Sequence, residues 1–352
     1  MLLEGGRIGR GATAAGPGLL TIEPYPDFLF LFQQFGLRAA RHIWQAARRA
    51  SLDFAALLRR LGIRCDLATH DLIRVIVSSG DAARMRRELT ARKEAGLDTS
   101  WLTAARLAAE TGLQGAGGIR SAGDATIDPF RAALGLASAA QSAGAQIVER
   151  SPVRRVKVGR RTVEIKTDGG VVTAGHVVIA TNHSALHRAL QRHLTRVETY
   201  GVVTAPLDAR QRRALGRAGA ILRDTDHPQH FVRPARDDRL MITGADQPPV
   251  PSQSLPRVLV QRTGQLMYEL SRLYPDISGI EADYGWNIPL VQTADGLPCV
   301  GPHRNFPRHL FALGAGHNGA GTALLAARIL LRRYQEQPDK ADELFGFSRL
   351  LD

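Results

Sequence analysis

The chain of 352 residues contains only two cysteines, Cys65 and Cys299. Because they form neither a Cys-x-x-Cys pair nor another metal-ligand spacing, the sequence predicts no metal site. So few thiols fit a reduced, cytoplasmic setting, and a single structural disulfide stays open. The sequence also lacks an apolar run long enough to cross a bilayer and a hydrophobic segment of the signal-peptide type at its start.

Lysine is scarce as well, and arginine carries almost all of the net charge of +13. The lysines are Lys93, Lys157, Lys166 and Lys340. A surplus of this size raises the hypothesis of a nucleic-acid-binding protein. The arginines are spread along the whole chain, however, and no basic stripe interleaved with aromatic residues is present. We therefore expect no nucleic-acid partner, while an attraction for anionic substrates or surfaces stays open.

No internal repeat, low-complexity tract or long linker interrupts the chain, which is large enough for two domains. Apolar residues recur at helical spacing between about residues 25 and 62. The same criteria predict further helices over residues 81–95, 103–111, 130–143, 255–274 and 322–334. The segment VVIATN at 177–182 is apolar up to a polar end, which is typical of a central parallel strand.

Between residues 200 and 245 the pattern changes to short strands separated by turns, which indicates antiparallel pairing. Segments that alternate helix and strand flank this β-rich middle on both sides. We therefore expect a mixed α/β (α+β) fold in which two domains interleave along the chain. One domain would comprise residues 1–70, 120–195 and 295–352, and the other residues 71–119 and 196–294.

The most informative motif is the segment LGAGHNGAGT at 313–322. A predicted strand enters a glycine-rich loop and a predicted helix leaves it, so the amides at the helix start have no intrahelical acceptor. Such a helix end favours negative charge, including the charge that a reduced flavin develops at N1 and the C2 carbonyl. A tight strand-to-helix turn without a ligand is the alternative, and the motif alone does not decide between the two.

Three other segments have the pattern of parts of a dinucleotide site. Glu4 follows two leucines, as a ribose-binding carboxylate follows a strand. The glycine-rich residues 9–14 offer backbone amides to a pyrophosphate or ring edge, and residues 180–182 end a buried strand, where α/β sheets bind ligands. Glu4 as an exposed terminal acid and residues 9–14 as a flexible start are the alternatives, so the order of the segments is the evidence.

In that order the motifs resemble the D-amino-acid oxidase-like family of FAD-dependent oxidoreductases. The matching stretches are LEGGRIGRGAT at 3–13, VVIATN at 177–182, FVRP at 231–234, RLMITG at 239–244, TADGLPCVGP at 293–302 and the glycine-rich loop at 313–322. They span essentially the whole chain. The resemblance implies a GR2-type Rossmann-like FAD-binding domain, formed by residues 1–70, 120–195 and 295–352, interleaved with a β-rich substrate or cap domain.

The resemblance also implies an enzyme that oxidises a C–N bond of an amine or amino acid. Hydride would pass from the substrate to flavin N5, the resulting imine would hydrolyse, and oxygen or another acceptor would reoxidise the flavin. The positions that match the family's FAD-binding residues are Glu4, Arg7, Gly11, Ala12, Thr13, Val153, Ala180, Thr181, Gly314, Gly316, His317, Asn318, Gly319 and Thr322.

By the same resemblance, Glu4 would hold the ribose, Ala12 and Thr13 would meet the pyrophosphate, and Val153 would contact adenine through its backbone. The loop at 313–322 would border the isoalloxazine. His317 and Arg233 are the candidates for a direct chemical role, although His317 as a packed turn residue and Arg233 as a structural residue are the alternatives. The sequence offers no convincing catalytic base.

The chain departs from the family's pattern at its start, because no G-x-G-x-x-G strand, loop and helix precede Glu4. That strand is normally central, so we expect an exposed hydrophobic edge beside residues 177–180 and 310–313, and weak or no FAD binding. A start placed too far downstream, a second subunit that supplies the piece, and a decayed gene are the open explanations. A non-catalytic remnant or a partner-dependent subunit is therefore the alternative function.

Two further departures concern substrate and cofactor. Members that oxidise α-amino acids place a carboxylate-binding arginine shortly before the DGLP stretch, whereas residues 286–292 contain none. Arg233 is the nearby candidate, and the pattern favours an amine or an unusual amino compound as substrate. No cysteine stands where other members attach flavin covalently, and Cys299 lies beyond the turn at residues 295–296, so we expect non-covalent FAD.

Overall fold

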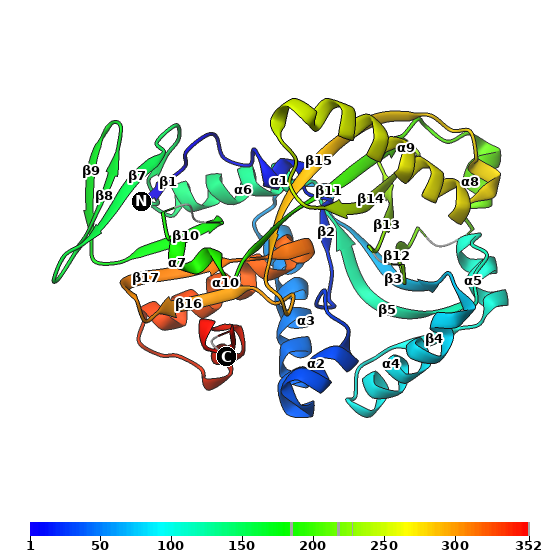
Figure 1. The fold of residues 1–352 in the computed structure, drawn as a ribbon, viewed down its shortest axis with the longest axis horizontal. Helices are drawn as coiled ribbons and strands as arrows, with labels where there is room; N and C mark the ends of the chain where they lie inside the picture. Colours follow the sequence, from blue (N-terminus) through cyan, green and yellow to red (C-terminus); the bar gives the residue numbers. More distant parts are fainter. Residues whose placement is uncertain (184–185, 217–218, 227, 351–352) are drawn as a thin grey trace.

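The computed structural model describes residues 1–183, 186–216, 219–226 and 228–350, and its strands form one large sheet and three small ones (Figure 1). The large sheet has nine strands in the order β15-β11-β14-β13-β12-β3-β5-β2, with β4 pairing with β5 outside this path. Their bounds are β2 Leu19–Leu20, β3 Ala68–Ile76, β4 Ser100–Leu102, β5 Gly117–Thr126, β11 Thr195–Thr204, β12 Ile221–Asp224, β13 Phe231–Ala235, β14 Arg239–Gln247 and β15 Ala282–Gln292.

Most neighbours in this sheet are antiparallel, as the alternating pattern of residues 200–245 predicts. One pair differs from that expectation, because β12 runs parallel to β3, with Ile221 opposite Leu72 and Asp224 opposite Val75. The direction of a strand relative to a distant neighbour depends on the path of the intervening chain. The local pattern of residues around β12 contains no information about that path.

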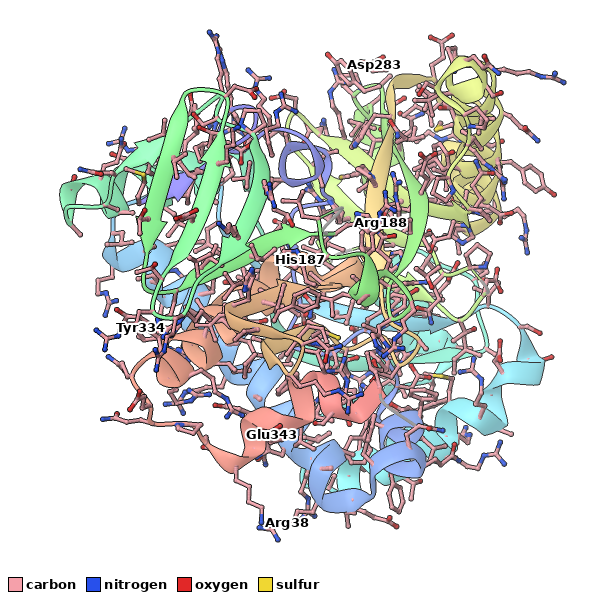
Figure 2. The ribbon with its side chains drawn as sticks, turned by 60° about the vertical axis from the view of Figure 1, so that its left-hand side comes forward. Arg38, His187, Arg188, Asp283, Tyr334 and Glu343 are labelled. Atoms are coloured by element: carbon pink, nitrogen blue, oxygen red, sulfur yellow. The ribbon has the colours of Figure 1, made fainter. Side chains whose placement is uncertain are left out.

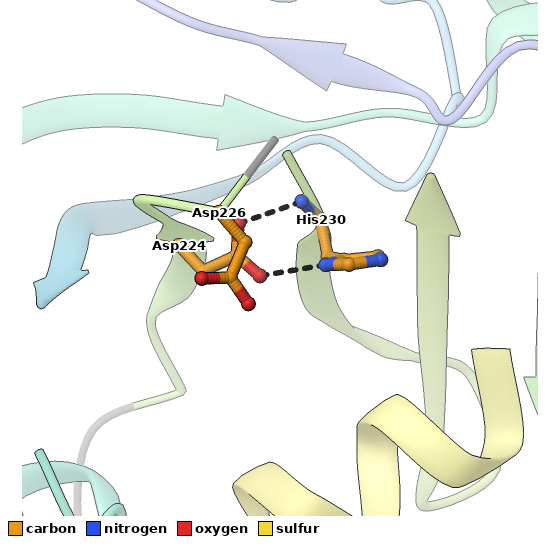
Figure 3. A group of neighbouring side chains, drawn as sticks. All are labelled: Asp224, Asp226 and His230. Carbon is orange, nitrogen blue, oxygen red and sulfur yellow. Dashed lines mark hydrogen bonds and ion pairs between the residues drawn. The ribbon is translucent and has the colours of Figure 1, made fainter. Parts of the chain in front are cut away.

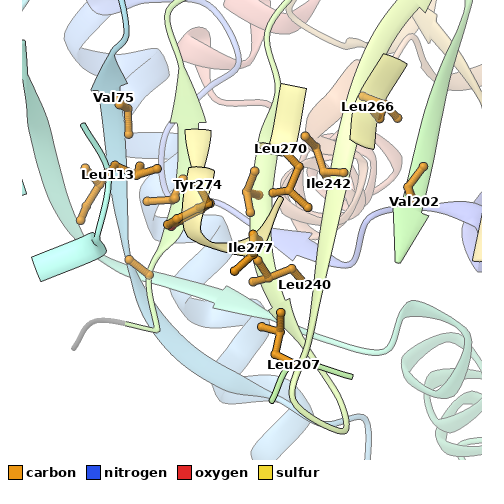
Figure 4. Packing of buried hydrophobic residues seen from close by; sticks show 14 of the residues in the cluster. Val75, Leu113, Val202, Leu207, Leu240, Ile242, Leu266, Leu270, Tyr274 and Ile277 are labelled. Carbon is orange, nitrogen blue, oxygen red and sulfur yellow. The ribbon is translucent and has the colours of Figure 1, made fainter. Parts of the chain in front are cut away.

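The face of the large sheet that carries α9 (Leu255–Leu273) is closed by the largest hydrophobic cluster (Figures 1 and 4). Leu266 and Leu270 of α9 pack with Ile242 of β14 and with Tyr274 and Ile277, and all five are nearly or fully buried. Burial of each such side chain contributes about 1.5–3 kcal/mol before the entropy cost of ordering it. This cluster holds α9 against the large sheet.

The second hydrophobic core lies between helices from the beginning and the end of the chain. The segment predicted as helical around residues 25–62 contains α2 (Phe28–Phe35) and α3 (Leu37–Arg60). Ile43 and Trp44 of α3 pack against Leu325 and Ile329 of α10 (Gly319–Tyr334) in one buried cluster. The helical spacing of apolar residues in the sequence is thus confirmed as a buried face.

The remaining helices are short or lie at the periphery (Figure 1). They are α1 Ala12–Ala15, α4 Ala82–Glu94, α5 Ala104–Thr111, α6 Pro129–Ser142, α7 Arg188–Gln191 and α8 Ala209–Ala214. Short 3-10 segments cover Ser79–Asp81, Ser252–Ser254, Pro275–Ile277, Gly316–Asn318, Lys340–Phe345 and Phe347–Leu350. None of the helices among the described residues has the combination of length and hydropathy that crossing a membrane needs.

Three small sheets lie beside the helical core. β1 (Leu2–Leu3) pairs in parallel with β6 (Ile147–Val148). β10 (Val177–Asn182) pairs in parallel with β17 (Phe306–Leu313), which is antiparallel to β16 (Cys299–His303). β7 (Val153–Val158), β8 (Val163–Thr167) and β9 (Gly170–Ala174) form an antiparallel meander, seen at the left of Figure 1.

β10 was expected to be a central parallel strand, and its direction is parallel as predicted. It nevertheless forms one edge of its sheet, because β17 is its only partner strand among the described residues. Val178 of this strand is 53% exposed, although it belongs to an apolar run. An exposed valine on an unpaired edge agrees with the expectation of an open hydrophobic edge at this strand. The same expectation is wrong for residues 310–313, because β17 is paired on both sides and its Leu310, Phe311 and Leu313 are at most 7% exposed.

The division of the chain into two domains stays a prediction. The large sheet contains residues from both predicted domains, because β3 spans residues 68–76 and β5 spans residues 117–126, and these strands cross the predicted limits at 70/71 and 119/120. The basic side chains are distributed over many elements, as Arg38 of α3 and Arg188 of α7 illustrate in Figure 2.

Candidate active site

One cavity of about 570 Å³ lies where the amino-terminal loop, α6, β10, the large sheet and the start of α10 meet. Its wall includes Ala12 and Thr13, which begin the short helix α1 of the amino-terminal segment, and Gly316, His317 and Thr322 from the glycine-rich segment. The two segments that the sequence suggested as parts of one dinucleotide site therefore share a cavity. Its volume lies within the range of about 300–1,000 Å³ that is typical of cofactor and small-molecule sites.

Asn182, at the end of β10, holds the glycine-rich loop in place. Its backbone carbonyl accepts a hydrogen bond from the Gly314 amide at 3.1 Å, and its side-chain oxygen accepts one from the Ala315 amide at 3.0 Å. Gly314 has a φ of +68°, and a Cβ there would lie 3.0 Å from Leu194. Glycine fits this turn because it has no side chain to clash. The ends of β10 and β17 are thus joined directly.

α10 begins at Gly319, earlier than the predicted start at Thr322, and follows a 3-10 turn over Gly316–Asn318. No side chain caps its first turn, and the Thr322 hydroxyl instead donates to the Asn318 carbonyl at 3.0 Å. Gly319 and Ala320 of the same turn line the cavity. An uncapped helix start in a cavity wall is a favourable position for a negatively charged ligand group.

His317 connects this loop to the large sheet. Its Nε2 lies 2.9 Å from Oδ2 of Asp246 on β14, and its ring stacks on Tyr25 with 4.4 Å between the ring centroids. Burial opposes ionisation of Asp246, but the hydrogen bond and charge of His317 outweigh burial and hold the pKa of Asp246 below its usual value. The sequence analysis missed Asp246, which stands two residues beyond the matched stretch ending at Gly244.

The residues predicted for the far end of the cofactor lie outside the cavity wall. Glu4 follows β1, and its Oε1 accepts a hydrogen bond from the Gly6 amide at 2.7 Å. The Glu4 carbonyl accepts one from Ser151 at 2.8 Å, so the loop after β1 lies beside the chain that leads into β7 at Val153. Glu4 thus lies beside Ser151, two residues before Val153, and the assignment of Glu4 and Val153 to an adenosine site stays a prediction.

The other predicted positions divide into two groups. Ala180 lines the cavity, and Asn318 lines a small adjoining cavity. Arg7, Gly11 and Thr181 are exposed and belong to neither wall.

Arg233, the arginine suggested as a chemical or carboxylate-binding residue, lies in neither of these two cavity walls. Its Nε donates to the Pro17 carbonyl at 2.7 Å, and its Nη1 donates to the Pro234 carbonyl at 2.8 Å. The first bond ties β13 to the loop that precedes β2, and the second stays within β13. A structural role explains both contacts.

The comparison with known protein families decides which of the sequence interpretations holds. The sequence model of the family described as FAD dependent oxidoreductase matches residues 1–333. The chain belongs to this family. The resemblance inferred from the motifs is therefore confirmed at the level of the family.

Relatives in this family match over most of their length. Glycine oxidase from Geobacillus kaustophilus (strain HTA426) is 28% identical over 99% of this chain and 89% of its own length. Gamma-glutamylputrescine oxidoreductase from Escherichia coli (strain K12) is 21% identical over 97% and 79%, respectively. The crystal structure of glycine oxidase from Geobacillus kaustophilus superposes with a TM-score of 0.77 at 22% identity, covering 98% of this chain and 90% of that one. The mixed α/β fold is that of the family.

The cavity wall fits the flavin part of FAD. Small residues surround the start of α10, which leaves room for a planar ring system; they are Ala180, Ala315, Gly316, Gly319 and Ala320. A Cβ at Gly321 would lie 2.4 Å from the Asn318 side-chain oxygen, so the first turn of α10 is packed too closely for a larger residue there. A narrow, largely apolar space at an uncapped helix start suits a flat ring with a polar, charge-accepting edge.

A separate cluster contains Asp224, Asp226 and His230, whose ligand-type atoms all lie within 4.8 Å of one another (Figure 3). Asp224 accepts hydrogen bonds from the backbone amide and the ring Nδ1 of His230, at 2.8 and 2.7 Å. Burial lowers the pKa of His230, but the contact with Asp224 outweighs it and raises that pKa above the usual value. The His230 Nε2 points away from both carboxylates (Figure 3). A buried ion pair between Asp224, at the end of β12, and His230, just before β13, accounts for the contact between these two residues.

Proposed function

We propose that the protein is an FAD-dependent enzyme that oxidises the C–N bond of an amine or amino acid. The observation that carries the proposal is the shared cavity of the amino-terminal loop and the uncapped start of α10. The names of two relatives, glycine oxidase and gamma-glutamylputrescine oxidoreductase, support an amino acid or amine as substrate. Because one is an oxidase and the other an oxidoreductase, oxygen and a different acceptor are both compatible with the proposal.

In this proposal the start of α10 and the preceding turn with Gly316 and His317 border the isoalloxazine, and Ala12 and Thr13 at the start of α1 face the pyrophosphate. Glu4 holds the ribose. When bound, FAD accepts a hydride from the carbon next to the substrate nitrogen, and the imine that leaves hydrolyses in water. The amides at the helix start stabilise negative charge at the ring edge next to them.

The chain's own residues contribute position and exclusion of water. Ile288 and Leu290 of β15 and Phe231 of β13 give an apolar lining to the cavity that the small residues at α10 also line. Such a wall strengthens electrostatic interactions inside the cavity because it keeps water away from them. The pair of Asp246 and His317 fixes the orientation of the imidazole in that wall. His317 is a candidate to hold or move a proton, and no other catalytic base is assigned.

The test is to express the full chain, quantify bound flavin, and measure anaerobic flavin bleaching by a panel of amines and amino acids. Ala320→Asp places an acid at the helix start and in the cavity wall, where it favours the helix but repels the reduced ring. We expect this variant to lose flavin or flavin reduction. Ala209→Asp, at the exposed first position of α8, is the matched control and should retain both. Equal behaviour of the two variants would contradict the assignment of α10.

We further propose that full occupancy by FAD requires another strand, loop and helix between β1 and β10. Each of these strands has a single parallel neighbour among the described residues, and the exposed Val178 and Ala180 of β10 line the cavity. The segment would come from upstream sequence or from a second chain, and a non-catalytic remnant stays the alternative. Adding a family-type segment in cis or in trans should raise the flavin content, and no gain in either arrangement would refute the requirement.

We also propose that FAD is held without a covalent bond and that the protein functions in the cytoplasm. Both cysteines, Cys65 and Cys299, are free and buried. Unpaired thiols are typical of a reducing compartment, which supports the second point. The acid-release experiment in the Discussion tests the first.

A further inference from the structure

His317 is the only ionisable side chain in the wall of the main cavity, within the part of the chain that the structure describes. The other polar side chains of that wall are hydroxyls and one amide, those of Thr13, Thr199, Thr243, Thr322 and Asn182. A hydroxyl or a neutral amide does not take up a proton near neutral pH, whereas an imidazole does. A proton that leaves a ligand inside this cavity therefore has a single side chain to accept it.

Asp246 is the negatively charged neighbour of this imidazole. Its Oδ2 lies 2.9 Å from His317 Nε2, and the side chains of Asp246 and His317 are only 17% and 10% exposed, respectively. Burial raises the pKa of Asp246, but the contact with His317 outweighs burial and lowers that pKa below its usual value, so the carboxylate is charged at neutral pH. A negative charge at this distance stabilises a positively charged imidazole, and the scarcity of water around the pair strengthens the effect.

Tyr25 contributes a second interaction that favours a positive charge on His317. The two rings stack with 4.4 Å between their centroids and 12° between their planes. The face of an aromatic ring is electron-rich and attracts a cation that lies within about 6 Å of its centre. The imidazole thus meets a carboxylate at Nε2 and an aromatic ring on its face, and both neighbours stabilise the protonated form.

The other charged groups of this region are held in contacts of their own. Glu23 and Arg223 line the small adjoining cavity, which also has His317 in its wall. The Glu23 carboxylate lies 2.6 Å from Arg92, and the Arg223 guanidinium donates hydrogen bonds to two neutral oxygens. The charge of Arg223 disfavours a second cation in its vicinity, so a protonated His317 depends on a carboxylate beside it. Asp246 is the only carboxylate within ion-pair distance of His317 among the described residues.

We propose that His317 is the general base that takes a proton from the ammonium group of the substrate, and that Asp246 is a positioning residue that stabilises the charge His317 gains. The N–H bond of the ammonium group breaks, its electron pair stays on the substrate nitrogen, and the proton binds Nδ1, because Nε2 faces Asp246. An ammonium ion has no lone pair with which to form the C=N bond, so this transfer precedes oxidation. The imidazolium later returns the proton to water. This inference rests on the proposed function and assigns its proton acceptor.

The first test measures anaerobic flavin reduction by saturating benzylamine or N-methylglycine, whichever reduces the full chain faster, as a function of pH. His317→Gln should slow reduction at about pH 7 by at least about 100-fold. Its rate should recover as pH rises toward the pKa of a free amine, about 10, because the substrate then arrives without the extra proton. His230→Gln is the matched control, since His230 pairs with Asp224 at 2.7 Å but lies in neither cavity wall. It should keep the wild-type pH profile.

A second readout does not depend on flavin. Nitrogen-15 NMR of the imidazole groups in the full chain follows proton uptake by His317 as pH falls, and the spectrum of His317→Gln identifies its resonances. Asp246→Asn should move this proton uptake to a pH lower by about one unit, because the variant lacks the negative charge beside the ring. Asp224→Asn, which removes the carboxylate beside His230, is the control and should leave the resonances of His317 unchanged.

The outcomes separate this inference from the proposed function. Flavin reduction with the same pH profile in wild type and His317→Gln would overturn the inference and leave the proposed function standing. Proton uptake by His317 that does not respond to Asp246→Asn would overturn the role of Asp246, with or without flavin. A flavin-loaded chain that no amine or amino acid reduces would refute the proposed function, and the inference that rests on it would fall as well.

Discussion

His317 and Asp246 join two parts of the chain that the sequence assigned to different domains. The Nε2 of His317, in the glycine-rich loop, lies 2.9 Å from the Oδ2 of Asp246, on β14 of the large sheet. The same histidine stacks on Tyr25, which precedes α2. One imidazole therefore contacts the amino-terminal segment and the sheet while it belongs to the loop at α10. The position of the His317 ring therefore depends on the amino-terminal segment, the large sheet and the glycine-rich loop.

The first prediction concerns this pair. Asp246→Asn should destabilise the protein by about 1–3 kcal/mol at neutral pH, because it replaces a charge-assisted hydrogen bond and leaves polar atoms unmatched. The pKa of Asp246 is lowered in the folded chain, so its stabilisation is complete above the unfolded value of about 4 and is lost as pH falls through the folded value. The difference between wild type and variant should shrink in acid.

Urea unfolding between about pH 3 and pH 7 measures this difference. His317→Asn and the double variant complete a double-mutant cycle, which isolates the coupling between the two side chains. Strictly additive effects at neutral pH would show that the pair contributes nothing beyond its individual contacts.

The second prediction concerns the buried ion pair of Glu23 and Arg92, both at most 2% exposed. Burial raises the pKa of Glu23, but Arg92 and Arg74 outweigh burial and lower it overall. Glu23→Gln should therefore cost about 3–5 kcal/mol at neutral pH, because it leaves Arg92 short of one charge. The depressed pKa means that this stabilisation is lost as pH falls below about 4.

Asp168→Asn is the control for the second prediction, because Asp168 pairs with Arg154 on an exposed hairpin. Ion pairs in solvent contribute little, so the urea midpoint of this variant should equal that of wild type. Comparable losses in both variants would mean that burial does not govern these pairs.

Local features of the fold were predictable from the sequence where neighbouring residues determine them. An aspartate followed by a proline is a typical helix start, and the Asp128 carboxylate accepts a hydrogen bond from the Arg131 amide at 3.0 Å at the start of α6, whose first residue is Pro129. The helical face of α3 is likewise visible as apolar spacing. Caps and periodicity involve residues within a few positions of each other, so the sequence contains all of the information they need.

The candidate site was only partly predictable, because its contacts join residues that are far apart in the sequence. The contact between Asp246 and His317 joins residues far apart in the sequence, and nothing near Asp246 distinguishes it from the other aspartates. Arg233 was singled out because it lies in a matched stretch, yet its guanidinium binds two backbone carbonyls. The sequence shows which stretch Arg233 belongs to, whereas the backbone carbonyls that its guanidinium reaches depend on the tertiary fold.

The third prediction concerns Asp124, which is fully buried on β5. Burial, followed by the charge of Glu23, raises the pKa of Asp124 well above its usual value. A raised carboxyl pKa makes the stability fall as pH rises, whereas the lowered pKa values of Asp246 and Glu23 make it rise. Its contribution is complete below the unfolded value of about 4 and is lost as pH rises through the folded value. Asp124→Asn should therefore become the more stable protein as pH rises, by about 1–3 kcal/mol at most.

Asp124→Ala separates this titration from a hydrogen bond, because Asp124 Oδ1 accepts from the Ile22 amide at 3.0 Å. Both variants should flatten the dependence of unfolding free energy on pH, and the alanine variant should be less stable than the asparagine variant at every pH. A wild-type profile that does not fall relative to Asp124→Asn between about pH 4 and pH 8 would contradict the raised pKa.

The fourth prediction concerns the attachment of flavin. Cys299 is fully buried, and burial raises the pKa of its thiol to about 11. The thiolate is the nucleophilic form, so at about pH 8 this residue is inert. Acid precipitation of flavin-loaded protein should leave the flavin in the supernatant, and Cys299→Ser should retain the wild-type flavin content. Flavin fluorescence that stays with the denatured wild-type polypeptide and vanishes from the Cys299→Ser variant would show that a covalent bond forms despite the burial.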